Sequence, residues 1–83
     1  MNDFHVEVRV TPRGGLLDPQ GKAVAGALHS LGFDGVRETR IGRLIRMDVR
    51  AEDETAARAS VEEMCRKLLA NPVTEDYEIE VTG

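Results

Sequence analysis

Strict alternation of apolar and polar side chains marks three stretches of the chain, and this alternation is typical of half-buried β-strands. Residues 4–10 place one phenylalanine and three valines on one face and polar or charged side chains on the other. Residues 44–51 and 76–81 alternate in the same manner. We expect each stretch to form a strand that turns its apolar side toward a common core.

A weaker alternation covers residues 36–41, directly before Gly42. A glycine at the first central position suits the tight type II′ turn of a two-residue hairpin. The pattern therefore predicts a further strand over 36–41, joined through a hairpin at Gly42 to the strand at 44–51.

Between Asp18 and Gly32 the apolar residues recur with helical spacing instead. Asp18 is a favourable N-cap residue, and Pro19 suits the first helical position, where its missing N–H costs nothing. Gly32 suits the left-handed conformation that ends many helices. One apolar stripe results, which we expect to face the core: Val24, Ala27, Leu28 and Leu31.

A second helix is expected after Asp53, which can cap it, and before Asn71-Pro72, which ends it. Its apolar positions are also spaced three and four residues apart, with Cys65 beside them: Ala57, Val61, Met64 and Leu68.

The elements follow one another in the order β-α-β-β-α-β. Two right-handed β-α-β units of this kind predict an α+β fold of the ferredoxin-like class, a four-stranded antiparallel sheet with both helices on one face. Eighty-three residues without a linker or a repeat predict a single domain, residues 1–83.

Composition narrows the class of protein. One cysteine and two histidines exclude an internal disulfide and leave no set of ligands for a zinc ion. No apolar run reaches the roughly 20 residues that a membrane span needs, so we expect a cytoplasmic protein without a membrane partner. A net charge of −4 and a pI near 5.1 argue against nucleic acid as a partner.

The residues that could act in catalysis or ligand binding have no predicted partner residues in the sequence. Cys65 lies late in an amphipathic helix and is expected to be a buried apolar residue. His29 and His5 have no predicted partner that would make either of them a base. Gly14-Gly15 precedes a helix N-terminus, but Asp18 occupies that terminus and would repel a phosphate. We therefore expect no catalytic, cofactor-binding or metal-binding residue in this chain.

Two surfaces remain to be explained. The side of the first helix opposite its stripe carries small residues, including Gly26, which costs about 1 kcal/mol relative to alanine in a helix. The polar face of the sheet carries charges of both signs, which suits a symmetric interface. The candidates for an oligomer interface are Arg46, Asp48, Arg50, Glu78 and Glu80.

The sequence resembles the signature of the PurS family over nearly its whole length. The most specific pieces are Asp18-Pro19-Gln20-Gly21 at the first helix and Asn71-Pro72-Val73 after the second. Further matching pieces follow in the same order: Ala27-Leu28, Leu31-Gly32, Gly42-Arg43, Ala56-Ala57-Arg58, Met64-Cys65 and Glu75-Asp76-Tyr77.

The resemblance implies a function that composition and spacing do not show. PurS is the small subunit of phosphoribosylformylglycinamidine (FGAM) synthase, an ATP-dependent C–N ligase of purine biosynthesis. In that family PurL binds ATP, with magnesium, and the ribonucleotide, and PurQ releases ammonia from glutamine. PurS is a homo-oligomer (a dimer or a dimer of dimers) that bridges PurL and PurQ so that ammonia passes between them, and it supplies no catalytic residue.

On this basis we expect the first helix and its cap to contact PurL or PurQ. The candidates are Asp18, Pro19, Gln20, Gly21, Lys22, Gly26 and His29. The alternative from another class is an ACT-like regulatory domain that binds an amino acid between subunits, because it shares the same order of elements.

Overall fold

The computed structural model describes residues 1–14 and 18–83. The second glycine of Gly14-Gly15 lies outside the described residues. The elements are β1 (Asn2–Pro12), α1 (Pro19–Ser30), β2 (Arg43–Ala51), α2 (Glu54–Met64), a π-helical turn η1 (Cys65–Leu69) and β3 (Glu75–Thr82).

The three strands form one antiparallel sheet in the order β2-β1-β3. β1 is the central strand and pairs with β2 from Asn2↔Ala51 to Val10↔Arg43. On its other side it pairs with β3 from His5↔Thr82 to Pro12↔Glu75. The three strands with strict alternation are therefore confirmed, and this register places their apolar residues on one face, except for Leu44, which lies opposite Arg9 on the charged face.

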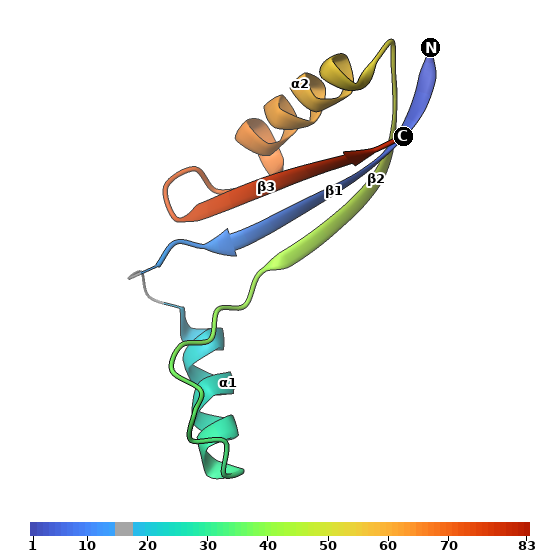
Figure 1. Cartoon of the computed structure of the whole chain (residues 1–83). Helices are drawn as coiled ribbons and strands as arrows, with labels where there is room; N and C mark the ends of the chain where they lie inside the picture. Colours follow the sequence, from blue (N-terminus) through green and yellow to red (C-terminus); the bar gives the residue numbers. More distant parts are fainter. Residues whose placement is uncertain (15–17) are drawn as a thin grey trace.

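α2 covers that apolar face (Figure 1). Asp53 caps the helix by accepting a hydrogen bond from the Ala56 N–H at 2.8 Å, as the sequence predicts. The fully buried side chains come from β1 and from one stripe of α2 that continues into η1: Val6, Val8, Val10, Ala57, Val61 and Cys65. The stripe follows steps of four residues, so it ends on Cys65. Met64 and Leu68, which were expected inside, are 37% and 82% exposed.

The prediction of a four-stranded ferredoxin-like sheet is wrong. Residues 36–41 are described and form no strand. Their backbone bonds to α1 instead, because the Asp18 carboxylate accepts from the Ile41 N–H at 3.1 Å and the His29 ring meets the Val36 carbonyl at 2.6 Å. The predicted hairpin at Gly42 is likewise absent. Gly42 instead lets its backbone pass close to β1, where an added Cβ would collide with the Val10 carbonyl.

The expectation that both helices cover one face of the sheet is also wrong. α1 and residues 36–41 form an arm that extends away from the end of the sheet (Figure 1). The radius of gyration is 16.2 Å, compared with about 12 Å for a compact domain of this length. The arm is defined here as residues 18–41.

The orientation predicted for α1 fails for the same reason. With no sheet beneath the helix, Val24 is 39% and Leu31 is 73% exposed. The covered side of the helix is the one that carries Gly21 and Ala25, which residues 36–41 overlie. The start and end of the helix are as expected, since Asp18 caps it and Gly32 has φ of 96°. In the described residues no helix is long and apolar enough to cross a membrane.

Candidate functional site

Asp18 connects the two parts of the arm, α1 and the return segment of residues 36–41, through hydrogen bonds. One carboxylate oxygen accepts from the Gly21 N–H at 3.1 Å, and the other accepts from the Ile41 N–H. These backbone hydrogen bonds hold the pKa of the Asp18 carboxyl below its ordinary value. The cap residue therefore also fixes the return segment beside α1, a role that the spacing of the motif did not reveal.

The packing of the arm requires a glycine at position 21. It is the one buried residue of α1, and a Cβ there would collide with the Thr39 carbonyl and with the Asp18 carboxylate. Gly26 differs, because a Cβ at that position would meet nothing within 4 Å. The structure thus accounts for Gly21 within the chain and leaves Gly26 on an open surface.

The other partner-interface candidates are exposed on the arm. Pro19, Gln20 and Lys22 are exposed around the first turn, and His29 is exposed about two turns after Lys22. Lys22, Gly26 and His29 recur at intervals of four and three residues, so they lie on one helical face. The structure therefore brings Lys22, Gly26 and His29 together on one polar, small-residue surface, whereas Gln20 lies on the side of the helix that carries Val24.

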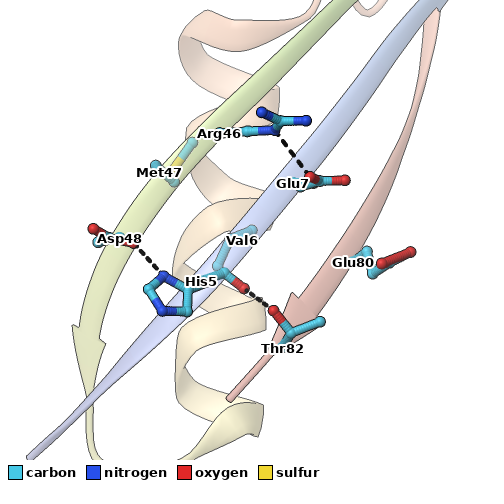
Figure 2. Close-up of a pocket in the computed structure, with 8 residues that line it drawn as sticks. All are labelled: His5, Val6, Glu7, Arg46, Met47, Asp48, Glu80 and Thr82. Atoms are coloured by element: carbon cyan, nitrogen blue, oxygen red, sulfur yellow. Dashed lines mark hydrogen bonds and ion pairs between the residues drawn. The ribbon is translucent and has the colours of Figure 1, made fainter.

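The open face of the sheet carries a cross-strand ladder of charges (Figure 2). Glu7 on the central strand accepts from Arg46 on β2 at 3.0 Å, and Arg9 donates to Glu80 on β3 at 3.3 Å. His5 lies 2.5 Å from Asp48, and the Arg50 and Asp3 side chains lie 3.5 Å apart. The opposite charges of β2 and β3 are thus connected through Glu7 and Arg9 of β1, the strand that lies between them.

This face is hollowed only slightly. A shallow cavity of about 430 Å³ lies over the ladder, lined by residues of all three strands that Figure 2 labels. The His5 and Asp48 side chains are each 74% exposed, so water screens the pair and keeps its net contribution small. Four of the five oligomer-interface candidates take part in the ladder, and Glu78 lies opposite Arg9 in the register.

Sequence reasoning missed a hydrogen-bonded joint where the arm meets the sheet. Arg43 donates to both oxygens of Glu75 at 3.0 Å and to the Leu69 carbonyl at 2.7 Å. Glu75 also accepts from the Asn71 N–H, and these bonds lower the pKa of the Glu75 carboxyl, with the Arg43 bond as the largest cause. Arg13 donates to the Pro72 carbonyl at 2.8 Å. The specific Asn-Pro-Val motif is therefore held in place by two arginines.

The lone chemical groups do not assemble into a reactive site within the described residues. Cys65 is buried in the core, and burial raises the pKa of its thiol. Among the described residues there is no group of three or more histidine, cysteine or carboxylate side chains that could hold a metal ion. The surfaces that the structure offers are the arm, the charged sheet face and exposed apolar side chains.

The sequence model of one protein family, described as PurS, phosphoribosylformylglycinamidine (FGAM) synthase, matches residues 5–83. The chain belongs to the PurS family. It is 43% identical to the PurS subunit of FGAM synthase from Synechocystis sp., over 99% of this chain and 82% of that relative. It is 44% identical to the corresponding subunit of Bacillus subtilis, over 94% of this chain and 92% of that one.

Solved structures agree with the family assignment. The PurS of Bacillus subtilis superposes with a TM-score of 0.83 at 41% identity, covering 96% of this chain and 99% of that chain. A chain in the structure of PurLQS from Thermotoga maritima superposes with a TM-score of 0.89 at 32% identity, covering 99% and 100%. The elongated form with a separate α1 arm is thus similar to the form of these PurS-family chains, and the ACT-like alternative is set aside.

Proposed function

We propose that this chain is the small subunit of FGAM synthase and that it bridges a glutaminase subunit, PurQ, and a synthetase subunit, PurL. The observation that carries the proposal is the match over 99% of the chain to a chain of the PurLQS structure. In this role the subunit holds the other two together so that ammonia released from glutamine reaches the ATP-dependent step.

The chemistry belongs to the partners in this proposal. ATP and magnesium are bound by PurL, and the glutaminase thiol belongs to PurQ. The burial of Cys65 supports this division, because a buried thiol with a raised pKa is a poor nucleophile. The subunit then contributes binding surfaces, and it acts as a homo-oligomer.

The partner surface is proposed to be the polar side of the arm, with Gly26 near its middle. A bare glycine on an exposed helical face lets another backbone approach closely, and this gain can offset its cost to the helix. The Asp18 hydrogen bonds stiffen the arm on which this surface lies, so less freedom is lost when a partner binds.

The experiment is reconstitution of the three-subunit enzyme with Gly26→Arg. An arginine at this open position leaves the fold intact by circular dichroism and blocks close approach of a partner. Glutamine-dependent formation of the amidine should fall at least tenfold, whereas activity with ammonium salts, which bypasses PurQ, should be retained. Ala59→Arg, on the solvent side of α2, is the matched control and should change neither activity.

The outcomes separate the parts of the proposal. Full glutamine-dependent activity of Gly26→Arg would remove the arm as the partner surface. Full glutamine-dependent activity of PurL and PurQ without this chain would refute the bridging function itself.

A further inference from the structure

Most cationic side chains of this chain are paired with a carboxylate, but two on the arm are not. Acidic residues outnumber lysine and arginine by 15 to 11, so carboxylates are in excess. Across the described residues 1–14 and 18–83, Lys22 and Arg37 are the two lysine or arginine side chains without an ion pair or a hydrogen bond. The protomer thus leaves two positive charges unpaired although negative charges are plentiful.

Lys22 and Arg37 line the same small cavity of the arm. Lys22 lies on α1, and Arg37 lies on the return segment, which runs beside the helix (Figure 1). The cavity is lined from both segments and has a volume of about 190 Å³. The fold therefore brings together two unpaired cations that are distant in the sequence.

The carboxylates that line this cavity do not neutralise the two cations. The two oxygens of Asp18 already accept from backbone N–H groups, those of Gly21 and Ile41. The two oxygens of Glu38 accept from the Arg40 guanidinium at 3.3 and 3.4 Å. The positive charge on this side of the cavity is therefore available to an anion from outside the chain.

The size and charge of the cavity favour a side-chain carboxylate over a free phosphate ligand. Pockets that hold free drug-sized ligands are typically about 300–1,000 Å³, and this cavity is smaller. Asp18 and Glu38 at its wall repel a doubly charged phosphate more strongly than a singly charged carboxylate. Lys22 also belongs to the helical face with Gly26 and His29, so the cavity adjoins the surface proposed for a partner.

We propose that Lys22 and Arg37 together bind one acidic side chain of the subunit that docks on the arm. The Lys22 ammonium and the Arg37 guanidinium donate to the oxygens of an aspartate or glutamate of that subunit. Gly26 lets the partner backbone come close, and the carboxylate fixes where along the arm the partner docks. This inference rests on the proposed bridging function and specifies the chemistry by which the partner is recognised.

Titration of this chain into a fixed amount of the other two subunits tests the contact. The concentration that gives half-maximal glutamine-dependent activity should rise about tenfold in Lys22→Gln and in Arg37→Gln, because each removes one charged donor from the interface. The rate at saturation should keep its parent value. Lys67→Gln is the matched control, since Lys67 has Glu63 of its own chain 3.0 Å away, and it should leave the half-maximal concentration unchanged.

Salt provides a second measurement on the same proteins. Raising the ionic strength from about 0.05 M to about 0.3 M should raise the half-maximal concentration of the parent severalfold. The double variant Lys22→Gln, Arg37→Gln should show a weaker dependence, because the charges that salt screens are gone. Circular dichroism should show the parent fold in every variant, since both side chains are exposed.

Carbodiimide coupling of the parent complex identifies the carboxylate without any variant. The reagent takes up the water that is lost when an amine and a carboxylate in contact form an amide, and it becomes a urea. The Lys22 Nζ should therefore be joined to an aspartate or glutamate of another subunit, which peptide mass spectrometry locates. Lys67 is the internal control and should couple to Glu63.

Three results would contradict the inference, and they differ in what they leave standing. Parent half-maximal concentrations in both Lys22→Gln and Arg37→Gln, in an enzyme that still requires this chain, would refute the contact and leave the bridging function intact. Coupling of Lys22 only to carboxylates of this chain's own sequence, within one copy or between two, would refute the choice of partner. Full glutamine-dependent activity without this chain would refute the bridging function and the contact together.

Discussion

The two helices of this chain follow the same local rules and end in different surroundings. Each begins at an aspartate that caps it, and each carries an apolar stripe. α2 lies on the sheet of its own chain and buries Val61 completely. α1 lies in the arm, where the His29 ring and the Asp18 carboxylate form hydrogen bonds with backbone groups of residues 36–41.

The difference follows from the segments that connect each helix to the sheet. The chain between β2 and α2 is two residues long, so α2 turns back directly over the strand that precedes it. The chain that leaves β1 and the chain that enters β2 pass through the joint around Arg43 and Glu75, and they carry α1 beyond the end of the sheet (Figure 1). An apolar stripe thus specifies that a helix must be covered, and the path of the chain determines what covers it.

The largest expected effect is a loss of stability on substitution of a buried side chain of α2, because α1 has no side chain buried in a comparable core. Val61→Asp places an unpaired charge in the core, so we expect the free energy of unfolding to fall by about 4 kcal/mol or more. Ala59→Asp, on the solvent side of the same helix, should change it by about 0.5 kcal/mol at most. Urea unfolding followed by circular dichroism measures both. A Val61→Asp protein with the parent midpoint would show that α2 does not hold the core.

A pair of glycines in α1 gives the next largest effect. Gly21→Ala forces a Cβ against the Thr39 carbonyl, and we expect a loss of about 1–3 kcal/mol. Gly26→Ala meets open space and should stabilise the helix by about 0.5–1 kcal/mol. The same unfolding experiment compares them. Equal effects of the two substitutions would contradict the close packing of residues 36–41 against the arm.

The smallest effect concerns the joint and is seen as a pH dependence. The pKa of Glu75 is lower in the folded protein than its ordinary value of 4.5, because Arg43 and the Asn71 N–H bond to the charged form. The folded state therefore binds fewer protons, so this contribution to stability is complete above about pH 5 and disappears as the pH falls through the folded pKa. Glu75→Gln should lower stability at pH 7 and flatten the curve below pH 5 relative to the parent.

Urea unfolding at pH 7, 5 and 3 provides this measurement. Glu78→Gln is the control, since its carboxylate is exposed on the open face of the sheet. A parent and a Glu75→Gln variant with parallel pH curves would show that the Arg43 bond is not formed in solution.

Local features of the chain could be predicted well. The alternation at residues 4–10, 44–51 and 76–81 specified three strands, because a period of two has no other regular explanation. The caps at Asp18 and Asp53 and the left-handed Gly32 followed from the side chains themselves. The motif that runs from Asp18 to Gly21, taken together with Asn71-Pro72-Val73 at its spacing, also indicated the family.

The errors about the fourth strand and about α1 share one cause, which is that residues 36–41 can satisfy their backbone groups in more than one way. A weak alternation allowed a fourth strand, but the Asp18 carboxylate and the His29 ring offered closer partners along the arm. Once that segment paired with α1, the helix had no sheet beneath it. The side that carries Gly21 and Ala25 became its inner face, while Gly26 and the apolar stripe remained exposed.

The sequence could predict which residues of the candidate site lie on a surface, but it could not predict which of them contact one another. The sequence indicated that Gly26 and the mixed charges of the sheet lie on surfaces, because exposed positions tolerate both. It did not show that Gly21 is an internal contact, or that Arg43 and Glu75 join distant segments. Those facts depend on which backbone comes close to which, and only the tertiary structure decides that. By itself the sequence determined the elements, their caps and the family, because these depend on neighbours within a few residues. The tertiary structure decided that one helix covers its own sheet and that the other extends away from it.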